Sequence, residues 1–229
     1  MSRGKTSKGH CLYCGTEMMK GATTKHLAAC EKRQSLFVFE KTGRNNAESE
    51  LFYHLRVQDG YKKEFWLDLE MRGSSTLKDL DSYLRAIWLE CCGHMSQFSI
   101  GGWEGGKMGM KRRADEIFTG EMEIVHIYDF GTSSETLIKA VAIREGKPIT
   151  KHPISLMARN LMPEAKCIEC GRLAAWLCNE CLIEENVWGT LCDEHAKKHP
   201  HDNYGEPVPL VNSPRLGMCG YTGPADPPY

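Results

Sequence analysis

Between residues 166 and 202 the chain holds five cysteines and three histidines, arranged in four close pairs. The pairs are Cys167/Cys170, Cys178/Cys181, Cys192/His195 and His199/His201. Thiolate sulfur and imidazole nitrogen are the usual zinc ligands in proteins, and a structural zinc ion takes four of them in a tetrahedron. Eight ligands are enough for two such ions. They leave no open coordination position of the kind that a catalytic zinc needs.

The last of these pairs is the weakest part of the pattern. His199 and His201 are separated by one residue, and Asp202 or the distant Cys219 could replace one of them. A single zinc site and redox chemistry at the C-x2-C pairs are the alternatives to two zinc ions. Thiolates bound to zinc are poor nucleophiles, which disfavours the redox alternative.

A second group of ligands stands near the N-terminus. Cys11, Cys14, His26 and Cys30 follow the spacing C-x2-C-x11-H-x3-C. The first pair is followed by a glycine that permits a tight turn, and the second pair is spaced by one helical turn, so both of its side chains can face one metal. This spacing predicts a small zinc finger, of a kind that usually folds only with its metal. The sequence therefore predicts three zinc ions in total.

Charge is spread unevenly along the chain. Residues 1–34 carry seven basic and two acidic residues, whereas residues 167–229 carry four basic and nine acidic ones. A basic finger suggests contact with phosphate groups of nucleic acid. The candidate contacts in or just after the finger are Lys20, Lys25, Lys32 and Arg33. A solvated, flexible head without a phosphate partner is the alternative.

The elements between these groups predict an α+β domain. Residues 51–57, 64–71, 94–102, 123–130 and 135–143 are strand-like, with aromatic or β-branched residues in partial alternation. Residues 76–90 place apolar side chains on one helical face after a capping box of Thr76 and Asp79. We expect a mixed or antiparallel sheet with this helix packed on it. The sequence therefore predicts three units: a finger at 1–34, a domain at 36–160, and a two-zinc module with a tail at 161–229.

Several residues of the middle segment resemble parts of catalytic sites. Gly101 to Lys107 matches G-x4-G-K, but a methionine stands where a phosphate loop needs a hydroxyl. Asp129, His94 and His126 are candidates for an enzyme whose reaction we cannot name. Cys91 and Cys92 end the apolar helix without a second pair nearby, so we interpret them as packing residues. No catalytic residue is assigned, and the sequence favours binding over catalysis.

Composition limits the compartment and the class of protein. The chain has 229 residues, 41% hydrophobic and 26% charged, with a formal charge of −1. No stretch approaches the roughly 18 apolar residues of a membrane helix, and the first residues lack a secretory apolar region. We expect a cytoplasmic protein with reduced cysteines and no membrane contact. The oligomeric state stays open.

The C-terminal spacing resembles cross-brace zinc modules such as the B-box. In those modules the first and third ligand pairs bind one metal, and the second and fourth bind another. The resemblance implies one site made of Cys167, Cys170, Cys192 and His195. It implies a second site made of Cys178, Cys181, His199 and His201.

The middle segment resembles the plasmid pRiA ORF-three-like domain, which is also found as a passenger protein of transposable elements. The matching strings are HLRV, FWLDLEMRG, TLKDLDSYLRAIW, HMSQFSIGG and IYDFG, over roughly residues 50–145. The C-terminal part resembles a zinc-bearing branch of that family, which closes with VNSPRLGMCGYTG. Trp66 is followed by Leu67 and Asp68, where the family usually has two arginines. The resemblance transfers no reaction to this chain.

These observations together predict a zinc-stabilised binding or adaptor protein. A protein partner is expected, as is nucleic acid at the finger, and a link to mobile elements follows from the resemblance. A structural scaffold in a protein complex, or an uncharacterised enzyme that uses the middle domain, is the alternative.

Overall fold

The computed structural model describes residues 7–42 and 48–229. The larger sheet has strands β1 (Lys8–Cys11), β2 (Glu17–Met19), β3 (Glu50–Asp59), β4 (Trp66–Arg72), β5 (Ser96–Ile100), β6 (Gly106–Met108), β7 (Glu123–Tyr128), β8 (Ser134–Gly146) and β9 (Ile154–Asn160). The smaller sheet has β10 (Trp176–Cys178), β11 (Gly189–Leu191) and β12 (Val208–Pro209). The α-helices are α1 (Thr23–Ala29), α2 (Glu31–Thr42), α3 (Leu77–Leu84), α4 (Ala114–Ile117), α5 (Asn179–Ile183) and α6 (Asp193–Ala196). Short helical turns are η1 (Lys20–Ala22), η2 (Arg85–Leu89), η3 (Gly102–Glu104) and η4 (Met218–Gly220).

The nine strands of the larger sheet run in the order β2-β1-β9-β4-β3-β8-β7-β5-β6. Every neighbouring pair is antiparallel. The predicted α+β class and the antiparallel sheet are confirmed. The five strand-like segments of the sequence correspond to β3, β4, β5, β7 and β8, with ends that differ by a few residues.

The predicted helix over 76–90 is present as α3 followed by the π-helical turn η2. Its capping box forms: Asp79 N–H donates to Thr76 Oγ1, and Thr76 N–H donates to the Asp79 carboxylate. The apolar face is buried against the sheet, as the spacing predicts. Its fully buried members are Leu77, Leu80, Leu84, Ile87 and Trp88.

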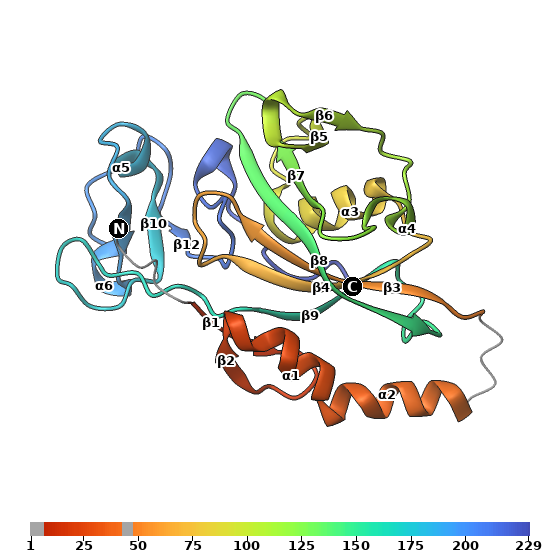
Figure 1. Cartoon of the computed structure of the whole chain (residues 1–229). Coiled ribbons are helices and arrows are strands. Elements are labelled where there is room, and N and C mark those ends of the chain that lie inside the picture. Colours follow the sequence, from red (N-terminus) through yellow and green to blue (C-terminus); the bar gives the residue numbers. More distant parts are fainter. Residues whose placement is uncertain (1–6, 43–47) are drawn as a thin grey trace.

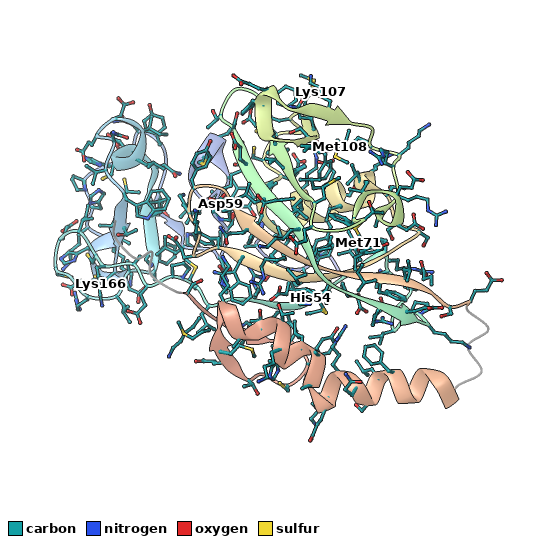
Figure 2. The ribbon with its side chains drawn as sticks, in the orientation of Figure 1. His54, Asp59, Met71, Lys107, Met108 and Lys166 are labelled. Carbon is teal, nitrogen blue, oxygen red and sulfur yellow. The ribbon has the colours of Figure 1, made fainter. Side chains whose placement is uncertain are left out.

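The two faces of the sheet are covered by different helices (Figure 1). Helix α3 lies on one face, and α1 and α2 lie on the other. Figure 2 labels one residue on each face: Met71 of β4 belongs to the main core, whereas His54 of β3 is on the face toward α1. That second face is polar, because His54 and Arg56 both bond the buried carboxylate of Asp68.

Three features of the fold lie outside the sequence prediction. Helix α2 and strand β9 were not expected. Strand β1 pairs with β9, so the finger extends the large sheet. The C-terminal module, with β10, β11 and β12, lies beside the sheet (Figure 1). After β12 the chain returns to the central domain.

Candidate metal centres

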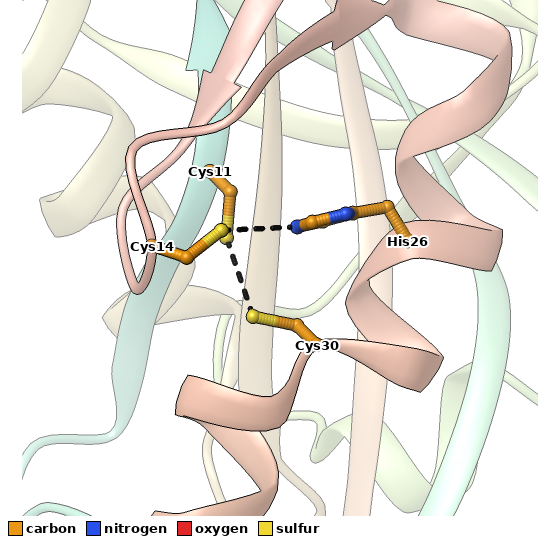
Figure 3. Close-up of side chains that lie close together, drawn as sticks. All are labelled: Cys11, Cys14, His26 and Cys30. Atoms are coloured by element: carbon orange, nitrogen blue, oxygen red, sulfur yellow. Dashed lines mark hydrogen bonds between the residues drawn. The ribbon is translucent and has the colours of Figure 1, made fainter.

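The N-terminal ligands converge as the finger spacing predicts. Cys11 ends β1 and Cys14 follows in a turn, while His26 lies on α1 and Cys30 caps its C-terminus (Figure 3). The Cys14 Sγ to His26 Nε2 distance is 3.3 Å, and the two sulfurs of Cys11 and Cys30 lie 4.0 Å apart. Neighbouring ligand atoms around a tetrahedral zinc lie roughly 3.3–3.8 Å apart, given its usual bond lengths. The Cys14–His26 distance lies in this range and the Cys11–Cys30 distance is slightly longer, so the four ligand atoms surround a position that suits a zinc ion.

The finger is packed on the sheet by apolar contacts. The fully buried Trp66 of β4 forms one cluster with Cys11, Leu27 and Cys30. Gly9 of β1 allows this contact, because a Cβ atom there would stand 2.4 Å from the Trp66 ring. The two buried thiols of the site thus face the sheet, and Cys14 faces solvent.

Polar contacts also hold the finger in place. Arg33 donates to Glu70 Oε2 at 2.5 Å and to the Leu27 carbonyl at 3.0 Å. Arg144 donates two further hydrogen bonds to the Glu70 carboxylate. Burial alone would raise the pKa of Glu70, but Arg144 and Arg33 outweigh it and hold that pKa below its ordinary value. Glu70 is therefore a charged anchor beneath the finger.

This arrangement changes the set of candidate phosphate contacts. Arg33 is buried and bound to Glu70, so its guanidinium is not exposed for a phosphate contact. Lys20 is half-buried, with its ammonium group bonded to Gln58 and near the Lys63 carbonyl. Burial, with the nearby Arg56 charge, lowers the pKa of Lys20 to about 8. Lys25 and Lys32 remain as exposed candidates.

The first C-terminal group joins Cys167, Cys170, Cys192 and His195. Gly171, at φ +71°, closes the turn after the first pair, and α6 follows Cys192. His195 Nδ1 lies 3.3 Å from Cys167 Sγ and 3.4 Å from Cys192 Sγ. The sulfurs of Cys170 and Cys192 lie 3.8 Å apart. These distances also fit the edges of a zinc tetrahedron.

The second C-terminal group joins Cys178, Cys181, His199 and His201. Cys181 Sγ lies 3.2 Å from His199 Nε2 and 3.3 Å from His201 Nδ1. Both C-terminal groups match the cross-brace pairing. His201 therefore completes this group, and Asp202 and Cys219 do not belong to it.

Glu169 lies between the two C-terminal groups. Its Oε1 is 3.0 Å from Nδ1 of His199, whose Nε2 faces the second group. Its Oε2 is 3.6 Å from Nε2 of His195, whose Nδ1 faces the first group. A carboxylate at the free nitrogen of a ligating histidine fixes the ring and increases its basicity. No spacing in the sequence predicts this role.

A fourth group was also missed. Cys91, Cys92, His94 and Cys219 place their ligand atoms within 4.8 Å of one another. His94 Nε2 lies 3.3 Å from Cys219 Sγ. Cys91 does pack against the main core, but Cys91 and Cys92 also belong to a ligand cluster, so four clusters suit zinc rather than three. The C-C-x-H spacing was a possible signal, but Cys219 is 125 residues from His94.

The candidate catalytic residues have other partners. His126 is fully buried, with Nε2 2.7 Å from Asp81, and burial lowers its pKa. Asp129 accepts a hydrogen bond from Arg215 at 2.6 Å. The G-x4-G-K segment runs through η3 into strand β6 instead of opening a helix, so it lacks phosphate-loop geometry.

Comparisons with known proteins do not assign this chain to a family. Among the described residues, no helix has the length and apolar character to cross a membrane. No family model matches the chain. No curated protein matches it. One similar solved structure is a protein of unknown function, MM3350 from Methanosarcina mazei Go1. It has 19% identity and a TM-score of 0.39, covering 46% of this chain and 68% of that chain. The resemblance to the pRiA ORF-three-like family stays a prediction, and no family is assigned.

Proposed function

We propose that this chain is a zinc-stabilised binding protein, an adaptor that contacts other macromolecules. One observation supports the proposal most strongly. All eleven cysteines belong to the four clusters, and each cluster has four protein ligands. Four protein ligands fill a tetrahedral zinc and leave no position for water or substrate, which is the pattern of structural ions. Zinc in this chain therefore stabilises the fold rather than carrying out a reaction.

The finger is the proposed contact with nucleic acid. Lys25 on α1 and Lys32 on α2 are exposed, and Lys8 on β1 is exposed as well. Exposed ammonium groups near a finger can neutralise phosphates without reading bases. With few such groups, we expect weak binding that depends on salt and not on sequence.

A salt titration tests this contact. The double variant Lys25→Glu/Lys32→Glu should lose affinity for a duplex DNA and for a single-stranded RNA. Its log–log salt slope on the duplex should be smaller by about 1.8, because each phosphate contact contributes roughly 0.9. Fluorescence anisotropy between low and moderate salt measures both quantities.

The matched control reverses the same charge at the opposite end of the sheet. Lys107 on β6 and Lys111 are exposed, and β6 is the far edge strand from β1 and β2. Lys107→Glu/Lys111→Glu should bind like the wild type. If both double variants lose affinity equally, the binding is general electrostatic attraction and not a property of the finger. If the wild type does not bind at low salt, the nucleic-acid contact is contradicted and the alternative, a protein partner, is favoured.

A further inference from the structure

The last part of the chain, residues 211–229, lies across the central domain as an irregular segment that includes the turn η4 and is here called the strap. Arg159 of β9 donates to the carbonyls of Asn212 and Ala225 at 2.8 and 2.7 Å. Ser213 Oγ donates to the Trp88 carbonyl at 2.7 Å. The side chains of Leu216 and Tyr221 are buried. The strap is therefore part of the packed structure, although it is remote in sequence from its contacts.

Arg215 is the buried anchor of the strap. It is 0% exposed and donates to Asp129 Oδ2 at 2.6 Å and to the Thr132 carbonyl at 2.8 Å. The same guanidinium lies 3.4 Å from Cys91 Sγ. The Arg215–Asp129 ion pair is thus fixed beside the fourth cluster. Its guanidinium donates to the Cys91 sulfur, and a hydrogen bond of this kind favours the thiolate form that binds metal.

Left-handed backbone positions occur in both segments that supply ligands to the fourth cluster. Gly93 has φ +70° and reverses the Cys-Cys-Gly-His segment after η2. Cys219 itself has φ +49°, between two glycines with positive φ. The left-handed conformation is unfavourable for a non-glycine residue, so other interactions must hold Cys219 there. A metal bond to its sulfur would supply such an interaction.

We propose that Cys91, Cys92, His94 and Cys219 bind a zinc ion that acts as a clasp between the strap and the central domain. This inference rests on the proposed function, in which the Cys/His clusters bind zinc. Three ligands come from the segment after α3 and η2, and the fourth comes from the strap. The ion therefore joins two segments that are more than 120 residues apart.

The exposure of its ligands sets this site apart. Each of the other three clusters has two buried cysteines, whereas the fourth has none. Cys92 and Cys219 are exposed, and the His94 side chain is 32% exposed. A chelator reaches exposed ligands first, so this ion should leave before the other three. Its loss should loosen the strap around Cys219, while the buried contacts of Arg215 and Leu216 remain and the finger and the cross-brace module keep their metal.

Native mass spectrometry of the full chain tests the clasp during a time course with a chelator. The wild type should begin with four zinc ions, and a fast step should leave three. Cys219→Ser should begin with three and show no fast step. Amide hydrogen exchange in residues 211–223 should rise in this variant and in the wild type after the fast step. Thr222→Ser, in the same strap but outside the cluster, should behave like the wild type.

His94→Ala removes a ligand from the other side of the clasp and should reproduce the loss of one ion and the strap exchange. Three ions in the wild type, all retained in Cys219→Ser, would overturn the clasp but leave the proposed function. The clasp also fails if Cys219→Ser keeps four ions, or loses one without change in strap exchange. A wild type without zinc would instead contradict the proposed function itself.

Discussion

Arg33 of helix α2 donates to Glu70 of strand β4 across 2.5 Å, and both side chains are buried. The contact joins the finger to the central sheet. In the sequence, Arg33 is one of several basic residues near the finger. In the structure, its charge forms an ion pair between the finger and the sheet. Together with the β1–β9 pairing, it makes the finger an extension of the sheet.

Replacing Arg33 tests this contact. Arg33→Ala removes a hydrogen bond to a charged carboxylate that keeps its Arg144 partner. We expect a loss of about 2 kcal/mol in the free energy of unfolding, measured by urea denaturation. The neighbouring Lys32 is exposed, so Lys32→Ala should change stability by less than about 0.5 kcal/mol. Equal effects of the two variants would show that Arg33 does not anchor the finger.

The Glu70 carboxylate predicts a pH dependence. Its pKa in the folded chain is lowered, because the two arginines outweigh the effect of burial. The stabilisation is therefore fully present above the ordinary glutamate pKa of about 4.3 and is lost as pH falls through the lower folded value. The stability difference between wild type and Glu70→Gln should be constant near neutral pH and shrink below that range. Urea midpoints of both proteins at each pH measure it. A difference that grew on acidification would contradict the lowered pKa.

Gly9 should be intolerant of a side chain. A Cβ atom there would stand 2.3 Å from the Arg159 carbonyl oxygen and 2.4 Å from the Trp66 ring. Gly9→Ala should destabilise the chain by about 1–3 kcal/mol, because β1 must move away from β9. Gly21→Ala is the control, since nothing lies within 4 Å of its Cβ position. Urea unfolding followed by tryptophan fluorescence compares them. A neutral Gly9→Ala would mean that β1 is not packed on Trp66.

Glu169 should increase the affinity of both cross-brace sites for zinc. Replacing it with Ala removes the carboxylate from His199 at 3.0 Å and from His195 at 3.6 Å. Loss of such a partner lowers metal affinity by about 10–100-fold. Because Glu169 is exposed, we expect a loss at the lower end of this range. Competition with a chromogenic chelator measures the affinities, with the larger effect expected at the His199 site. Glu164→Ala, also exposed, is the control. Unchanged affinities in Glu169→Ala would remove the role assigned to this carboxylate.

Much of the fold could be predicted because the sequence patterns that specify it lie within single helices, strands or turns. The capping box of Thr76 and Asp79 and the apolar spacing up to Trp88 lie within one helix. Strand segments such as β3 and β4 alternate between a core face and a polar face. Ligand pairs two or three residues apart are visible in the sequence, because one turn must bring both to one metal.

The remaining features depend on contacts between distant segments. Cys219 joins Cys91 across more than 120 residues, and no spacing rule connects them. The role of Arg33 depends on Glu70, which lies 37 residues away on another element. Strand β1 pairs with β9 at the opposite end of the central domain in sequence. In each case the chemistry of the residue was visible, but its partner was not.

The zinc content of the purified full chain tests the central claim most directly. All eleven cysteines and five of the histidines are divided among four ligand sets. Native mass spectrometry with elemental analysis should therefore give four zinc ions per chain. In protein purified without chelator and under reducing conditions, three ions would contradict only the clasp at the fourth cluster, whereas a chain without zinc would contradict the proposed function itself.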